Sequence, residues 1–240
     1  MQWIANLSGD DGELLVLSQA FSDCNCSITR EGPDYYLRSK TFDQYGSSEE
    51  VFEALDSMLS AVNGAARLRI ASRTRVQVAS LVAVDDRGER QAFIRPYVAN
   101  ASTTVIPAGV QINHLSGSQQ FIPPAESVRK WVEVSATDNE VADVLHILGS
   151  RQLDWRSLYW IFDAIEQDCR KDWTKVDPSV STWERDFTMS ANNRKISGVD
   201  GRHGADMGTP KRPGMSLSQA TECILQLVNA WIKAKIEGKL

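Results

Sequence analysis

Residues 216–232, SLSQATECILQLVNAWI, have the pattern of an amphipathic helix and indicate most directly how this chain folds. Ser216 and Gln219 have the spacing of a capping box, which satisfies backbone amides at the start of a helix. Gly238 is typical of a position just beyond a helix end. Apolar residues recur between these signals at helical intervals, at Ala220, Cys223, Ile224, Leu227, Val228, Trp231 and Ile232. This wide stripe predicts a helix that buries one face against other helices.

Two more amphipathic helices are predicted upstream of that stretch. Thr137 and Glu140 have capping-box spacing, and Gly149 fits a C-terminal cap. The apolar stripe between them is Val141, Val144, Leu145 and Leu148. A further helix over residues 154–169 would carry one apolar face, formed by Leu158, Phe162, Ile165 and Cys169. Three such stripes can bury one another, so the second half predicts a small helical bundle.

The first half has mixed α and β signals. Residues 13–21 form a short apolar run, and residues 34–42 begin with good strand formers. Ser47 and Glu50 predict the start of a helix, and Asn63-Gly64 predicts its left-handed stop. The helical stripe between them is Val51, Phe52, Leu55, Leu59 and Val62.

A hairpin is predicted next. Residues 75–84 and 91–98 read as strands on either side of the turn signal Asp85-Asp86-Arg87-Gly88, and residues 103–122 allow further short strands. The pattern changes to helical near Pro123-Pro124. We therefore expect an α+β protein, with a mixed N-terminal region over residues 1–124 that contains antiparallel hairpin strands. A helical region follows over residues 125–240.

Composition excludes several classes of protein. The chain has 240 residues, 42% hydrophobic and 24% charged, which argues against wholesale disorder. Its start resembles no signal peptide, and its apolar runs are too short to cross a membrane. Cys24 and Cys26 lie two apart, unlike the usual zinc pair, and the three histidines have no metal-like spacing. A soluble cytoplasmic protein without a cofactor, structural metal or membrane association is expected.

The candidate site lies in the long connection over residues 172–214, which has five glycines and no assigned element. Its stretch 190–214 is basic inside a chain of net charge −5, because Asp200 and Asp206 oppose more cations: Arg194, Lys195, Arg202, Lys211 and Arg212. Such a patch attracts phosphate groups. Neighbouring cations would lower the pKa of His203, which could then accept a proton from a hydroxyl. Asp163 and Glu166 on the middle predicted helix could reach this site.

The segments around this site resemble a known family. They are WRSLYWIFDAIE (155–166), SAN (190–192), GRHG (201–204), MSLSQA (215–220) and the helix near Trp231. These segments resemble a group of uncharacterised bacterial proteins, and their order over about residues 138–236 is similar to the HEPN superfamily. That resemblance implies a helical bundle, often dimeric. It also implies a metal-independent ribonuclease of toxin–antitoxin or phage-defence systems, with His203, Arg202 and Arg194 as its catalytic residues. His203 follows Arg194 by nine positions and Arg202 by one, and neither is the spacing of the family.

Several interpretations of the basic segment and of the whole chain remain open. The basic segment can be a solvated loop, a site that binds an anion or a nucleic acid without chemistry, or a site of RNA cleavage. The chain as a whole can instead be a non-enzymatic accessory protein that binds a protein partner. Trp173 and Trp183 fit such an interface as well as they fit a core. A small-molecule enzyme has little support, because no cofactor fingerprint is present.

Overall fold

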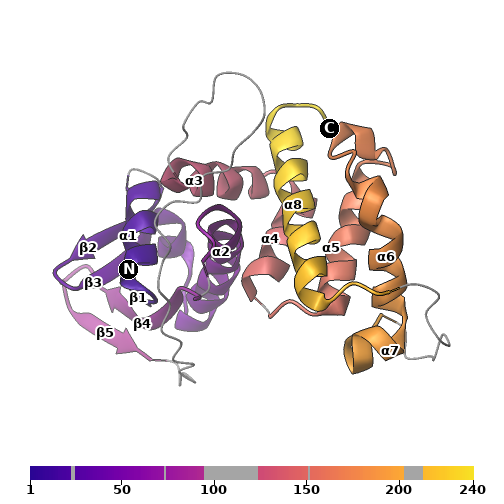
Figure 1. Ribbon diagram of the computed structural model, residues 1–240. Coiled ribbons are helices and arrows are strands. Elements are labelled where there is room, and N and C mark those ends of the chain that lie inside the picture. Colours follow the sequence, from indigo (N-terminus) through magenta and orange to yellow (C-terminus); the bar gives the residue numbers. More distant parts are fainter. Residues whose placement is uncertain (23–24, 73, 95–123, 151, 203–212) are drawn as a thin grey trace. The chain divides into compact units, whose positions relative to one another are not determined.

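The computed structural model describes residues 1–22, 25–72, 74–94, 124–150, 152–202 and 213–240 (Figure 1). The chain divides into two compact units, Met1–Glu133 and Val134–Leu240, so the division falls inside helix α3 (Pro124–Ser135). The N-terminal unit contains an antiparallel sheet and the C-terminal unit is helical. The predicted α+β class is confirmed.

Five antiparallel strands form the sheet of the N-terminal unit, in the order β2-β3-β1-β4-β5. The strands are β1 (Gln2–Ser8), β2 (Cys26–Glu31), β3 (Asp34–Ser39), β4 (Gln77–Val84) and β5 (Arg90–Phe93). Helix α1 (Asp11–Ala20) follows β1, and α2 (Ser48–Arg69) joins β3 to β4 after a short 3-10 helix (Lys40–Gln44). The succession β1-α1-β2-β3-α2-β4 with this strand order is the ferredoxin-like, split βαβ arrangement, extended here by β5.

One face of the sheet forms the core of this unit. Along β1 the buried residues alternate, at Trp3, Ala5 and Leu7. Register places Ala5 between Leu37 of β3 and Leu81 of β4, both fully buried. Because side chains of a strand alternate between faces, this register gathers the apolar residues of three strands on one side.

Helix α2 is longer than its sequence predicted. It begins at the predicted capping box of Ser47 and Glu50, but it continues through Asn63-Gly64 to Arg69. The buried amide of Asn63 donates to Val76 O and accepts from Val76 N, both at 2.9 Å. The predicted left-handed stop at Asn63-Gly64 is therefore wrong: the Asn63 side chain binds the segment leading into β4 instead, and the left-handed residue after the helix is Ala71, with φ of 51°.

The predicted hairpin is present as β4 and β5. Asp85 Oδ1 accepts hydrogen bonds from the backbone amides of Arg87 and Glu89, and Gly88 has the positive φ of 80° that favours glycine. Strand β5 ends at Phe93. The strands suggested between residues 103 and 122 lie outside the described residues.

The C-terminal unit is built from α4 (Asn139–Ser150), α5 (Trp155–Asp168), α6 (Val180–Asn192), the short α7 (Arg194–Ser197) and α8 (Leu217–Ile236). Two 3-10 turns, Trp173–Lys175 and Gly198–Asp200, complete it. Helix α5 contacts α4, α6 and α8 (Figure 1). Its predicted apolar face is buried, as is the predicted stripe of α4, and the capping box of Ser216 and Gln219 starts α8. The predicted stripe of α8 is buried except for the half-buried Cys223, and α5 packs against both α4 and α8.

Three local predictions in this unit were wrong. Asp138, rather than Thr137, accepts the hydrogen bond from Val141 N at the start of α4, and α4 runs past Gly149 to Ser150. Residues 172–214 are no continuous loop, because they contain α6 and α7. Helix α6 buries Val180, Phe187 and Ala191, although the Ser179 side chain makes no capping hydrogen bond at its start. Without a capping signal, so polar a helix is hard to recognise from sequence.

A partly buried ion network joins three helices of this unit. Nζ of Lys235, on α8, lies 2.7 Å from Oδ2 of Asp138, just before α4, and 2.9 Å from Oδ2 of Asp168, at the end of α5. Trp231 Nε1 donates a hydrogen bond to the same Asp168 oxygen at 2.7 Å. Burial opposes ionisation of Asp138, but hydrogen bonds from Lys235 and Val141 N outweigh it and lower the pKa of this carboxyl. Burial likewise disfavours charge on Lys235, but its two carboxylate partners raise the pKa of the ammonium.

None of the described helices is both long and apolar enough to cross a membrane.

The contact between Asn63 and Val76 predicts a large loss of stability on truncation. Asn63→Ala leaves a buried N–H and a buried C=O without partners, which lowers the free energy of unfolding by about 2–4 kcal/mol. Urea denaturation followed by circular dichroism measures this change. The control Ser57→Ala, on the exposed face of the same helix, changes stability by less than about 0.5 kcal/mol. Equal effects of the two variants would contradict this role of Asn63.

The ion network predicts a pH-dependent contribution to stability. Lys235→Met lowers the free energy of unfolding by roughly 1–3 kcal/mol near pH 7. This loss lies between those typical of exposed and of buried ion pairs, because the network is partly buried. Because folding lowers the pKa of Asp138, the stabilisation disappears as pH falls below about 4. Because folding raises the pKa of Lys235, the stabilisation is retained as pH rises from neutrality to about 10 and is lost as pH rises further, through the raised pKa of the folded state. Urea denaturation across this pH range tests both limits.

The matched control is Lys233→Met on the same helix, whose exposed ammonium lies 3.9 Å from Glu237. We expect it to change stability by less than about 0.5 kcal/mol at every pH. A pH-independent effect of Lys235→Met would show that its aliphatic packing, rather than the ion network, stabilises the unit.

Candidate functional site

Of the three residues expected to be catalytic, the structure describes Arg194 and Arg202. His203 lies outside the described residues. Arg194 is exposed and is the first residue of α7. Arg202 follows the 3-10 turn Gly198–Asp200 and packs on α5, so it is the residue around which a site can be built.

Arg202 is held in place by three contacts. Its guanidinium lies over the Tyr159 ring, 4.0 Å from the ring centroid, and its Nη2 is 3.5 Å from Asp163 Oδ2. Its backbone N–H donates to Ala191 O of α6 at 2.9 Å. Tyr159 is only 8% exposed, so the ring under the guanidinium is shielded from solvent. In contrast, 41% of the Arg202 side chain remains exposed. The guanidinium is therefore oriented by the protein and still accessible to a ligand.

A second arginine attaches the same segment to α5. Arg156 donates from Nε to Gly201 O at 3.3 Å and from Nη2 to Val199 O at 3.1 Å. Gly201 also approaches α7 closely, because a Cβ at this position would overlap Ser197 Oγ. Residues 199–202 are thus held along one side of α5 by the Arg156 side chain. The close approach to Ser197 requires glycine at position 201.

Two adjacent residues of α6, Ser190 and Ala191, bind the chain at Met215 and at Arg202. Ala191 accepts from Arg202 N, and Ser190 Oγ accepts from Met215 N at 2.8 Å. Ser190 is fully buried and donates its own proton to Asp186 O at 2.6 Å. Helix α6 therefore anchors both the segment that ends at Arg202 and the segment that leads into α8.

Tyr159 belongs to an aromatic cluster between α5 and α6. Its ring stacks on Phe187 with centroids 5.9 Å apart, and Phe162 lies 5.2 Å from Phe187. Trp173 and Trp183 both pack against Phe162 and are half-buried, so they contribute to this cluster. Burial raises the pKa of the Tyr159 phenol, as does the charge of Asp163, while Arg202 and a hydrogen bond with Asn192 lower it in part.

These contacts suit binding better than proton transfer. A phenol with a raised pKa stays protonated near neutral pH, so Tyr159 is a poor base. Asp163 is engaged by Arg202. The exposed, pre-oriented guanidinium of Arg202 can donate hydrogen bonds to an anion, and its fork geometry matches two oxygens of a phosphate.

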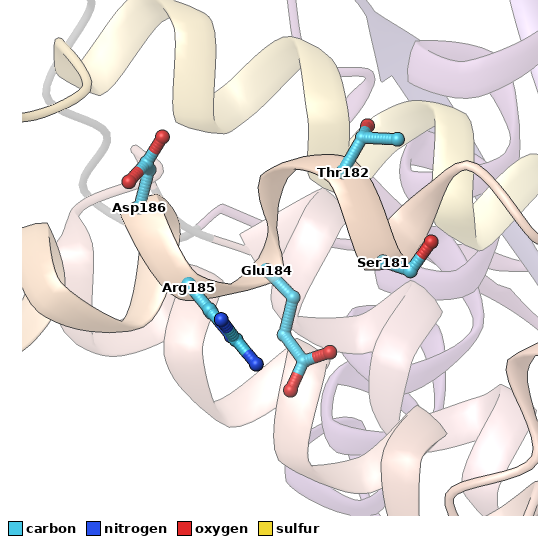
Figure 2. A pocket seen from close by; sticks show the side chains of 5 residues that line it. All are labelled: Ser181, Thr182, Glu184, Arg185 and Asp186. Atoms are coloured by element: carbon cyan, nitrogen blue, oxygen red, sulfur yellow. The ribbon is translucent and has the colours of Figure 1, made fainter.

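The hollow drawn in Figure 2 is not a comparable site. It has a volume of about 300 Å³ and is lined by one stretch of α6: Ser181, Thr182, Glu184, Arg185 and Asp186. Figure 2 shows that Thr182 and Asp186 point to one side of the helix, whereas Glu184 and Arg185 point to the other. Because these side chains diverge, they cannot surround one ligand.

The residues that the structure describes include no cluster of histidine, cysteine, aspartate or glutamate able to hold a metal ion. Cys26 of β2 instead lies against Met58, with 3.1 Å between the sulfur atoms.

Comparisons with protein-family models, curated proteins and solved structures give no match for this chain.

Sequence reasoning identified Arg202 and Asp163 but not their arrangement. Tyr159 has no sequence signal of its own as a binding residue, because it lies directly beside the predicted apolar face of α5. Its position four residues before Asp163 puts both on the same side of the helix, where one cation can contact them together. The two hydrogen bonds that Arg156 donates to backbone carbonyls 43 and 45 residues away have no sequence signal.

The close approach of Gly201 to Ser197 predicts a specific rescue. Gly201→Ala lowers the free energy of unfolding by about 1–3 kcal/mol, because the new methyl group overlaps Ser197 Oγ. Ser197→Ala removes that oxygen and costs about 1 kcal/mol, since its hydrogen bond to Asn193 O is lost. The double variant should therefore cost less than the two single variants together. Chemical denaturation of all four proteins measures this coupling, and strict additivity would contradict the contact.

Proposed function

We propose that this chain is a HEPN-like effector whose C-terminal unit binds RNA at the surface around Arg202 and cleaves it with the help of His203. A role in bacterial toxin–antitoxin or phage-defence systems fits this activity. The observation that carries the proposal is the stacking of Arg202 on Tyr159, which presents an oriented cation at the surface. The basic composition of residues 190–214 supports it further.

Phosphate is the ligand that best fits this cation. The Asp163 carboxylate compensates part of the charge but also orients the guanidinium, and 41% of the Arg202 side chain is exposed. Arg194 and Lys195 are the first two residues of α7 and precede Arg202 by a few residues in the chain. Both side chains are exposed, so they add positive charge at the surface. Affinity that arises from such contacts depends strongly on salt, because phosphate contacts release counterions.

Cleavage would proceed by transfer within the RNA itself. His203 as a neutral imidazole takes the proton of a ribose 2′-hydroxyl, and the 2′-oxygen forms a bond to the adjacent phosphorus. The bond from phosphorus to the 5′-oxygen breaks, and this oxygen takes a proton from water or from an imidazolium. The products are a 2′,3′-cyclic phosphate and a 5′-hydroxyl. Arg202 and Arg194 would stabilise the negative charge that develops on the phosphate oxygens.

Binding and cleavage of a labelled single-stranded RNA test this proposal in the full-length protein. In EDTA we expect wild type to cleave the RNA to cyclic-phosphate ends. Arg202→Ala should weaken binding roughly tenfold, because it removes a charge-assisted hydrogen bond to phosphate. It should also reduce the dependence of log affinity on log salt by about 0.7. His203→Ala should bind like wild type and cleave at least about a hundredfold more slowly.

Lys233→Ala is the matched control, because it removes an exposed cation on α8 that pairs with Glu237. Its affinity and cleavage rate should equal those of wild type. Full cleavage by His203→Ala would contradict the catalytic role of this histidine. A folded wild-type protein that neither binds nor cleaves RNA would refute the proposal and favour the non-enzymatic accessory role.

A further inference from the structure

The side of α5 that binds residues 199–202 also carries an exposed tryptophan. Trp160 is 44% exposed and lies four residues after Arg156 and three before Asp163, so the three side chains share one side of the helix. Arg156 binds the backbone of Val199 and Gly201, and Asp163 pairs with Arg202. Trp160 therefore lies between the two residues that anchor this segment. The Val199 side chain is 74% exposed.

We propose that Trp160 stacks on an unpaired base and makes single-stranded RNA the preferred ligand of the site. The inference rests on the RNA binding proposed above. A bound strand would place a phosphate against Arg202 and a neighbouring base on the indole of Trp160. Aromatic stacking combined with cations along the backbone is the general means by which proteins bind single strands without sequence readout.

Charge and area favour a nucleic acid strand over a protein partner. A stable protein interface buries about 800 Å² on each side around an apolar centre. In the described part of the C-terminal unit, few large apolar side chains are exposed, namely Trp160, Val199, Leu217, Ile236 and Leu240. Leu217 and Ile236 are the first and last residues of α8, so the length of this helix separates them and they do not form one patch with each other. One exposed indole beside arginines instead matches a base and its phosphate.

The stacked arrangement also discriminates between single and double strands. Bases of an RNA duplex are paired and stacked on one another, so their faces are not available to an indole. A duplex could still place phosphates against Arg202 and would retain only the electrostatic part of the affinity. The ratio of the affinity for single strands to the affinity for duplex therefore reports on Trp160. The electrostatic affinity that both ligands share reports on the cations.

Fluorescence anisotropy with a labelled 12-nucleotide single strand, and with the duplex of the same sequence, tests this inference in the full-length protein. Wild type should bind the single strand more tightly. Trp160→Ala should weaken single-strand binding roughly 5- to 100-fold and leave duplex binding unchanged, and Trp160→Phe should recover most of the loss. Ile236→Ala, which truncates an apolar residue of similar exposure on α8, is the control and should bind like wild type.

The outcomes separate this inference from the function on which it rests. If wild type binds neither RNA, the proposed function fails and the inference falls with it. If wild type binds RNA but Trp160→Ala binds both ligands like wild type, the function stands and stacking is refuted. Sedimentation velocity supplies a further check. A shift from oligomer to monomer in Trp160→Ala would overturn the inference and assign Trp160 to a protein interface.

Discussion

The packing of aromatic rings between α5 and α6 is the interaction on which the candidate site depends. Phe187 of α6 contacts both Tyr159 and Phe162 of α5, and these rings exclude water from the inner side of the Tyr159 ring. The outer side of that ring can then support a guanidinium. Without this cluster Arg202 would lose its stacking partner, and its charge would be distributed over many conformations in solvent.

The surroundings of Arg202 combine rigid and accessible features in a way that suits ligand binding. Tyr159 and Asp163 restrict its orientation, and α6 holds its backbone, yet a large part of its side chain faces solvent. Such preorganisation lowers the entropy that a ligand contact would otherwise cost. The N-terminal unit has a ferredoxin-like arrangement of elements, which hosts many unrelated activities and therefore indicates no function by itself.

The candidate site could be predicted only in part. A surplus of cations over residues 190–214 is visible in the sequence, and it pointed to Arg202 and Arg194. The partners of Arg202 were not visible, because Tyr159 and Asp163 are separated from it by about forty residues and belong to a helix whose buried face was the stronger signal. The catalytic role of His203 stays a prediction, since this residue lies outside the described part of the chain.

By itself the sequence determined the elements that depend on local chemistry. Capping boxes at Ser47 and Ser216 started α2 and α8, apolar periodicity marked the buried faces of α4, α5 and α8, and Gly88 marked the turn between β4 and β5. Tertiary structure decided where local signals were overridden or absent. Asn63 continues its helix because its amide binds distant Val76, and polar α6 is stabilised by burying Phe187. Both outcomes depend on contacts between residues far apart in the chain, whose free energy exceeds a local preference of about 1 kcal/mol.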